Sequence, residues 1–196
     1  MTKPSNQEPK SAHDRLLDAA ATLFYNDGIT ATGIDTIVKR AGVAKKSLYN
    51  NFSSKADLVA SYLEARHAEW LKLYEARLRD ATGPHGRVMA VFLAYEDHAE
   101  HAYERGFRGC GLLNAAAELP AGDTGRTVVR GHKEQVEALL VQHVGDMLGD
   151  EPKRANQLAH HLAFLLEGAM ARAGLEGRSD CLHQARGMAT AMLEAL

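Results

Sequence analysis

Every charged side chain between Asp35 and Asp57 is positive. These side chains are Lys39, Arg40, Lys45, Lys46 and Lys55. A surface of one charge repels itself, and that cost is offset when its partner is a polyanion such as the phosphate backbone of DNA, which releases condensed counterions on binding. A charge run by itself more often marks a solvated face. The local fold of this segment therefore has to decide between the two interpretations.

The basic segment is expected to fold as two short helices that meet at Gly42. The first is indicated by apolar residues at positions i, i+3, i+4 and i+7, namely Ile34, Ile37, Val38 and Ala41. Glycine tolerates the left-handed backbone that a tight turn needs, and Val43 packs the turn. A second helix follows over about residues 44–51, with Leu48 and Phe52 pointing inward. Two short helices joined in this way predict a helix-turn-helix, and its positive charge favours a nucleic acid as partner.

Helical periodicity runs along almost the whole chain, without a hairpin signal flanked by alternating strands. The sequence therefore predicts an all-α fold. We expect about nine helices, over about residues 12–26, 34–41, 44–51, 55–79, 87–103, 110–119, 124–148, 153–174 and 180–196. In this prediction Gly83 and Pro84 end the fourth helix, and Pro120 ends the sixth.

The composition is that of a globular protein, with 196 residues of which 45% are hydrophobic and 24% charged. The net charge of −2 is unevenly spread. Residues 1–60 carry 8 Lys and Arg against 6 Asp and Glu, and the remainder carries 15 against 19. We expect three parts: a flexible arm over 1–10, a helix-turn-helix DNA-binding domain over 11–54, and a helical body over 55–196.

Two features suggest a reducing cytoplasm as the location. Cys110 and Cys181 lie far apart and have no metal-type spacing, so neither a disulfide framework nor a zinc ribbon is expected. No stretch approaches 18 uninterrupted apolar residues, and the N-terminus lacks the apolar core of a signal peptide. We therefore expect no membrane partner.

The last two expected helices carry more apolar surface than one core face needs. We expect them to form a homodimer interface, because a reader of two DNA half-sites needs two copies of its reading helix. The interface residues expected are Leu158, Leu162, Leu166, Met170, Ala185, Ala189, Met192 and Leu193. The alternative is that both helices are internal core.

The helix-turn-helix followed by an all-helical body resembles the tetracycline-repressor (TetR) family of bacterial regulators. The resemblance is specific over about residues 12–60, and it is architectural over most of the remainder. The segment 109–118 is also similar to one in several subgroups of the family. The matching residues of the specific part are Ala19, Ala20, Leu23, Phe24, Gly28, Thr32, Ile37, Ala41, Gly42, Val43, Ser47, Leu48, Tyr49, Phe52, Ser54, Lys55 and Leu58.

The resemblance implies that the second helix of the motif enters the major groove of a palindromic operator. It assigns base contacts to Lys45, Lys46 and Ser47, and phosphate contacts to Thr32, Tyr49, Asn51 and Lys55. Lysine can donate to guanine O6 and N7, which agrees with a base-reading role. The chain departs from the usual pattern at Ala44, Lys46, Asn50 and Asn51. These departures put the operator sequence beyond prediction.

The resemblance also implies a small-molecule pocket among the C-terminal helices and a repressor that its ligand releases from DNA. It makes the body over 55–196 an effector-binding and dimerisation domain. Candidate lining residues are Trp70, Phe92, Tyr95, Cys110, Leu113, Asn114, Phe164 and Leu165. Asn114 stands out, because a polar amide in an apolar helix needs a partner. No cofactor, metal site or catalytic residue is expected.

Three other functions remain open at this stage. Cys110 follows Arg105 and Arg108 at a helix start, so a thiolate there is a candidate sensor of oxidants or electrophiles. Histidines close together on expected helices, at 98 and 101 and at 160 and 161, make a metal-binding bundle or an enzyme conceivable, although no Gly-x-Ser-x-Gly occurs. A helical protein-interaction module would explain the apolar last two helices but not the basic helices of the helix-turn-helix.

Overall fold

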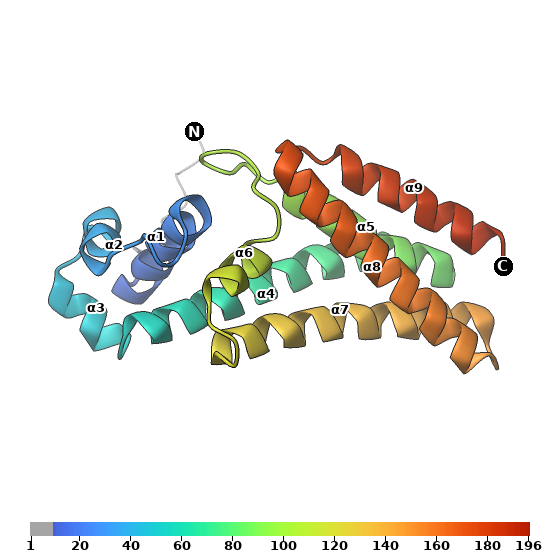
Figure 1. The fold of residues 1–196 in the computed structure, drawn as a ribbon, viewed down its shortest axis with the longest axis horizontal. Helices are drawn as coiled ribbons and strands as arrows, with labels where there is room; N and C mark the ends of the chain where they lie inside the picture. The colour runs from blue at the N-terminus through green and yellow to red at the C-terminus, as the bar shows by residue number, and fades with distance from the viewer. Residues whose placement is uncertain (1–9) are drawn as a thin grey trace, which may run out of the picture. The chain divides into compact units, whose positions relative to one another are not determined.

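The computed structural model describes residues 10–196, so the arm expected over 1–10 lies outside the described residues except for Lys10. The described part is all-α, as predicted, with no strand and nine helices (Figure 1). Their bounds are α1 Ala12–Asp27, α2 Ile34–Ala41, α3 Lys45–Asn51, α4 Lys55–Asp80, α5 Gly83–Ala99, α6 Gly111–Glu118, α7 Thr124–Leu148, α8 Pro152–Glu176 and α9 Asp180–Glu194. The chain forms two compact units that divide within α4, after Tyr62.

Unit 1, which ends at Tyr62, packs α1, α2 and α3 around a small apolar core. Leu16, Ile37 and Leu48 supply one fully buried side chain from each helix. Gly42 takes the left-handed conformation (φ 63°, ψ 39°) after α2. The next amide, of Val43, donates to the carbonyl of Val38 at 3.1 Å. This closes α2 with a glycine cap and turns the chain directly into α3.

Unit 2, which starts at Leu63, is built around α5. Most side chains of α5 are buried, because α7, α8 and α9 all pack against it. The C-terminal part of α4 adds a stack of rings, in which Trp70 lies parallel to Tyr74 and meets the edge of Tyr95. The resulting core contains these aromatic rings and the buried polar residues Glu96, His132 and His143.

Two helix ends differ from the prediction. Gly83 and Pro84 open α5 instead of lying in a loop, because proline is well suited to a first helical turn, where no backbone N–H partner is required. The same helix ends at Ala99, earlier than expected. The chain then folds back, so that the Tyr103 hydroxyl donates to the carbonyl of His98 at 3.0 Å.

The loop between α5 and α6 lies with its backbone directly against α8. Gly109 adopts φ 83°, a conformation that favours glycine. A Cβ built on Gly174 of α8 would lie 2.6 Å from the Cα of Gly109, which is closer than two carbon atoms can approach. Two glycines are therefore required here, and their contact fixes the position of Cys110 at the start of α6.

Candidate functional site

The outer surface of α3 carries most of the residues predicted to contact DNA. Lys45, Lys46, Tyr49 and Asn51 are exposed, and Ser47 is partly exposed. Leu48 is fully buried on the opposite face, which fixes the rotation of this seven-residue helix. α3 has no side-chain cap at Ala44, as its sequence suggested.

Lys45 already has a carboxylate partner. Its Nζ lies 2.8 Å from Oδ1 of Asp35 on α2, and both side chains are exposed. The hydrogen bond and the charge of Asp35 raise the pKa of Lys45, so the amine is a cation at neutral pH. A ligand of Lys45 must therefore compete with an acid from the same unit.

Two residues predicted to contact phosphate have hydrogen-bond partners within unit 1 instead. Thr32 is 3% exposed, and its hydroxyl donates to the carbonyl of Gly28 at 2.6 Å, so it stabilises the α1–α2 connection instead of facing solvent. Lys55 is half-buried, and its Nζ donates to the carbonyl of Ile29 at 2.6 Å. Both polar groups thus donate to backbone carbonyls of the α1–α2 connection.

Three of the eight residues predicted to line a pocket do meet in unit 2. Trp70, Tyr95 and Cys110 line an enclosed cavity of about 20 Å³, which is room for about one water molecule. Phe92 is buried but is not among the cavity's lining residues. The other lining residues, none of which was predicted for the pocket, are Arg66, His98, Gly111, Leu112, His132 and Met170.

Cys110 belongs to a polar cluster at the side of this cavity. Lys133 of α7 donates to Glu167 of α8 at 2.8 Å and to the Cys110 sulfur at 3.7 Å. The Tyr95 hydroxyl donates to Glu167 at 3.2 Å. Burial raises the pKa of Tyr95 strongly, so it is a neutral phenol at physiological pH. We call Cys110, Lys133, Glu167 and Tyr95 the lysine cluster.

His132 was detectable from the sequence, because it continues the apolar spacing of Val136, Leu140 and His143 along α7. Its Nδ1 lies 2.7 Å from Nδ1 of His67, so one ring donates and the other accepts. Burial, with the charge of Lys133, lowers the pKa of His132 to about 3. His132 is therefore neutral at pH 7.

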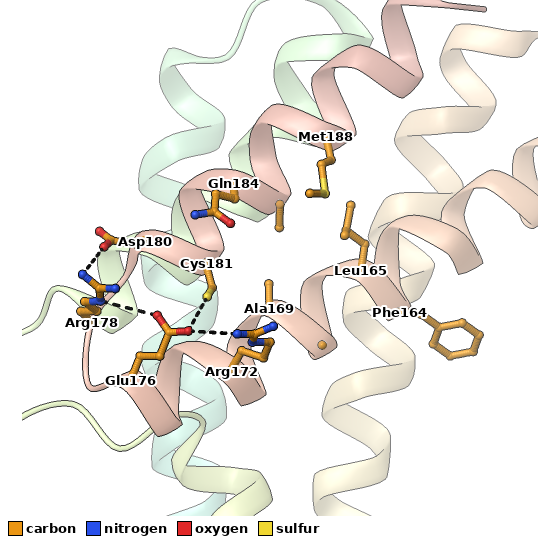
Figure 2. Close-up of a pocket in the computed structure, with 12 residues that line it drawn as sticks. Phe164, Leu165, Ala169, Arg172, Glu176, Arg178, Asp180, Cys181, Gln184 and Met188 are labelled. Atoms are coloured by element: carbon orange, nitrogen blue, oxygen red, sulfur yellow. Dashed lines mark hydrogen bonds and ion pairs between the residues drawn. The ribbon is translucent and has the colours of Figure 1, made fainter.

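The remaining predicted pocket residues lie outside this cavity and are exposed or partly exposed. Leu113 is 38% exposed, and the Asn114 amide donates to the carbonyl of Arg108 at 2.9 Å, which supplies the partner that this amide needs. Phe164 is 68% exposed. Phe164 and Leu165 line a separate, open pocket of about 680 Å³ formed by α8 and α9 (Figure 2).

On α8 and α9, the structure corrects the prediction of which side chains are available for a dimer interface. Leu158, Leu162, Leu166, Met170, Ala185, Ala189 and Leu193 are buried within the single chain, and of this set Met192 alone is partly exposed. On each helix the most regular row of apolar side chains faces the core, because its burial stabilises the fold of the single chain. The side chains left outside on these helices include Phe164, Leu175 and Met188.

Figure 2 shows that the open pocket has an apolar end and a charged end. Phe164, Leu165 and Met188 lie at the apolar end. At the other end Arg178 pairs with Asp180 at 2.9 Å and with Glu176 at 3.5 Å. We call the exposed side of α8 and α9 around this pocket the α8–α9 face.

Two other classes of site gain no support from the described residues. Nowhere in residues 10–196 do three or more metal-ligating side chains gather in a way that would hold a metal ion. In the same range no helix is both long and apolar enough to cross a bilayer.

A helix-turn-helix unit joined to a helical body defines a class of DNA-binding transcription regulators. The family of bacterial regulatory proteins called tetR matches residues 16–62. The fold agrees over nearly the whole chain with a TetR-family transcriptional regulator from Streptomyces coelicolor, at 29% identity and a TM-score of 0.79, covering 94% of this chain and 93% of that one. A tetR transcriptional regulator from Streptomyces avermitilis is 30% identical, with a TM-score of 0.75 and coverage of 94% and 96%. The chain belongs to the TetR family.

Two named transcription regulators are also similar to this chain. The transcriptional regulator AcuR of Cereibacter sphaeroides is 29% identical over 92% of this chain and 87% of its own length. The transcriptional repressor KstR2 of Mycolicibacterium smegmatis is 34% identical over 53% of this chain, and the match spans about half of that protein, 50%. The chain is accordingly a transcriptional regulator of this family and not an enzyme.

Proposed function

We propose that this regulator binds a palindromic DNA operator as a homodimer and that a small molecule held in unit 2 releases it. The observation that carries the DNA-binding half is the exposed surface of α3, with Lys45, Lys46 and Tyr49 outward on a helix that Leu48 anchors. We propose that Lys45, Lys46 and Ser47 face base edges and that Tyr49 and Asn51 face phosphates. Thr32 and Lys55 support the fold of unit 1.

Repression is proposed over activation on the strength of the named relatives. The KstR2 repressor matches 104 residues of this chain, whereas the FasR activator of Mycolicibacterium smegmatis matches 87. We keep the proposed division of the chain into a DNA-binding part over 11–54 and an effector and dimerisation part over 55–196. α4 contributes residues to both compact units, which suits it to carry a response between them.

The proposed effector site is the enclosed cavity of unit 2. Its buried aromatic lining and the adjoining lysine cluster combine apolar walls with a few fixed polar groups, the usual make-up of a small-molecule site. Because the cavity holds about 20 Å³, a larger effector must displace side chains as it binds. An effector that prefers the displaced state by 1–3 kcal/mol, a typical coupling free energy, lowers DNA affinity by the same amount.

The proposed homodimer uses the α8–α9 face. Its exposed Phe164 and Met188, beside the small residues Gly168 and Ala169, offer apolar area where another pair of helices can approach closely. Two copies related by a two-fold axis would form a four-helix contact.

The DNA assignment is tested with Lys46→Ala against Lys72→Ala, which removes an exposed lysine of α4. Duplexes are first selected from a random pool with the unaltered protein, and affinity is then measured by fluorescence anisotropy at several salt concentrations. Loss of a base contact should cost about 1–3 kcal/mol of binding and relax the sequence preference. Lys72→Ala should bind as the parent does. Equal affinities of the two variants would remove Lys46 from the reading surface.

A further inference from the structure

Cys110 is a buried thiol that faces an ammonium group in an enclosed space. The residue is 8% exposed, and its sulfur lies 3.7 Å from Nζ of Lys133. Burial by itself would lower the pKa of Lys133, but Cys110, Tyr95 and Glu167 more than offset this and raise it. Lys133 therefore keeps its positive charge beside the sulfur. A positive charge next to a cysteine assists its chemistry, because the thiolate is the nucleophile.

The cavity that Cys110 lines favours small reagents. Its volume of about 20 Å³ is room for about one water molecule, so hydrogen peroxide enters with a small displacement of the lining side chains, whereas a bulky reagent needs a large one. Trp70 lines the same cavity, is 4% exposed, and its indole Nε1 has no hydrogen-bond partner within the described residues. A buried donor without an acceptor is costly, so it favours a guest or a modification that brings an oxygen.

We propose that Cys110 is a site of oxidation by small hydroperoxides, of which hydrogen peroxide is the smallest. The sulfur, as thiolate, attacks one peroxide oxygen, and an S–O bond forms while the O–O bond breaks. The leaving hydroxide takes a proton from the Lys133 ammonium and becomes water, and the proton lost earlier from the thiol restores the ammonium. In sum, thiol and hydrogen peroxide give sulfenic acid and water, with two electrons passing from sulfur to peroxide.

The second cysteine of the chain provides an internal contrast. Cys181 at the start of α9 is more exposed than Cys110, yet its neighbour is an acid, because its sulfur lies 3.5 Å from Oε1 of Glu176 (Figure 2). Burial and Glu176 raise the pKa of the Cys181 thiol. A peroxide should therefore oxidise the buried cysteine faster than the exposed one, which is the reverse of the order that access alone would give.

The test uses the full chain with Cys181→Ser, so that Cys110 is the single thiol. The protein is treated with hydrogen peroxide in the presence of dimedone, which traps sulfenic acid, and the adduct is followed by intact mass spectrometry. Lys133→Met in this background should slow adduct formation about tenfold, since the charge that assists the thiolate is lost. Lys133→Arg should retain most of the rate. Lys72→Met, an exposed charge removed from α4, should leave it unchanged.

Three results would overturn the proposal. One is a trapping rate in folded Lys133→Met equal to that of Lys72→Met, with folding checked by circular dichroism. A second is faster trapping at Cys181, measured in Cys110→Ser, than at Cys110. A third is labelling of native Cys110 by bulky N-ethylmaleimide as fast as in urea, since the thiol would then be open and not held in a small cavity. None of these readouts involves DNA, so they stand apart from the test of the reading surface.

Discussion

At the scale of single residues, His132 should make the stability of unit 2 depend on pH. Its pKa is lowered to about 3 in the folded chain, mainly by burial, whereas an unfolded histidine titrates near ~6.5. Between these values the unfolded state binds the extra proton, so stability is lost as pH falls below about 6.5. From pH 7 to pH 5 this one group should remove up to about 2 kcal/mol of the free energy of unfolding.

The measurement is urea unfolding at pH 7 and pH 5 for the parent chain, for His132→Leu and for His161→Gln. His132→Leu should lose less stability between the two pH values than the parent does, whatever its stability at pH 7. His161 is exposed on α8, so its replacement should keep the parental difference. If His132→Leu shows the full parental loss, the buried ring is not the group responsible.

Residue by residue, the sequence located the outward face of α3 but not the partners of polar side chains. Leu48 was expected inward and is fully buried, because helical spacing determines which side of a short helix faces the core. Thr32 and Lys55 were assigned to phosphate by the family resemblance, and in the structure they donate to carbonyls of the α1–α2 connection. Spacing along a chain does not tell which backbone carbonyl a side chain will reach in a folded loop.

At the scale of elements, the contact between Gly109 and Gly174 should tolerate no added methyl group. Gly174→Ala would place Cβ 2.6 Å from the Cα of Gly109, so α8 or the loop before α6 must move. We expect a loss of about 1–3 kcal/mol, the usual cost of overpacking. Gly131 of α7 has nothing within 4 Å of a built Cβ. Gly131→Ala should therefore stabilise the chain by about 0.5–1 kcal/mol, because alanine favours a helix.

Thermal unfolding of the two alanine variants checks this pair. Melting temperatures that shift in opposite directions agree with the structure. A Gly174→Ala variant as stable as the parent would mean that the loop and α8 do not meet through their backbones.

Helices were easier to predict than their contacts. The nine helices and most of their bounds follow from apolar spacing and from glycine or proline at their ends. Gly83 and Pro84 were misplaced, because a proline that ends one helix serves equally well in the first turn of the next. Leu162 and Leu166 were expected at a surface, since an apolar stripe looks the same whether it faces a core or a partner.

At the scale of the whole molecule, the α8–α9 face should control the oligomeric state. Phe164→Glu introduces a charge on this face at a side chain that is already 68% exposed, so the fold of the single chain should survive. We expect a dimer for the parent and a monomer for the variant in analytical ultracentrifugation at micromolar concentration. Leu113→Glu changes an exposed apolar residue of α6 and should remain dimeric. A parent chain that stays monomeric, or a dimeric Phe164→Glu, would assign this face another role.

The pair between Lys45 and Asp35 has a consequence for how this regulator would search a genome. Their 2.8 Å contact means that any phosphate approaching Lys45 meets an amine already neutralised in part by its own unit. A duplex of unrelated sequence gains little binding free energy by displacing Asp35 from Lys45, because one carboxylate partner is exchanged for one phosphate partner. A correctly placed base that accepts two hydrogen bonds offers more than Asp35 does. If α3 has its proposed role, Asp35 competes with DNA for Lys45 within the same unit. This competition lowers non-specific DNA affinity more than it lowers affinity for the operator.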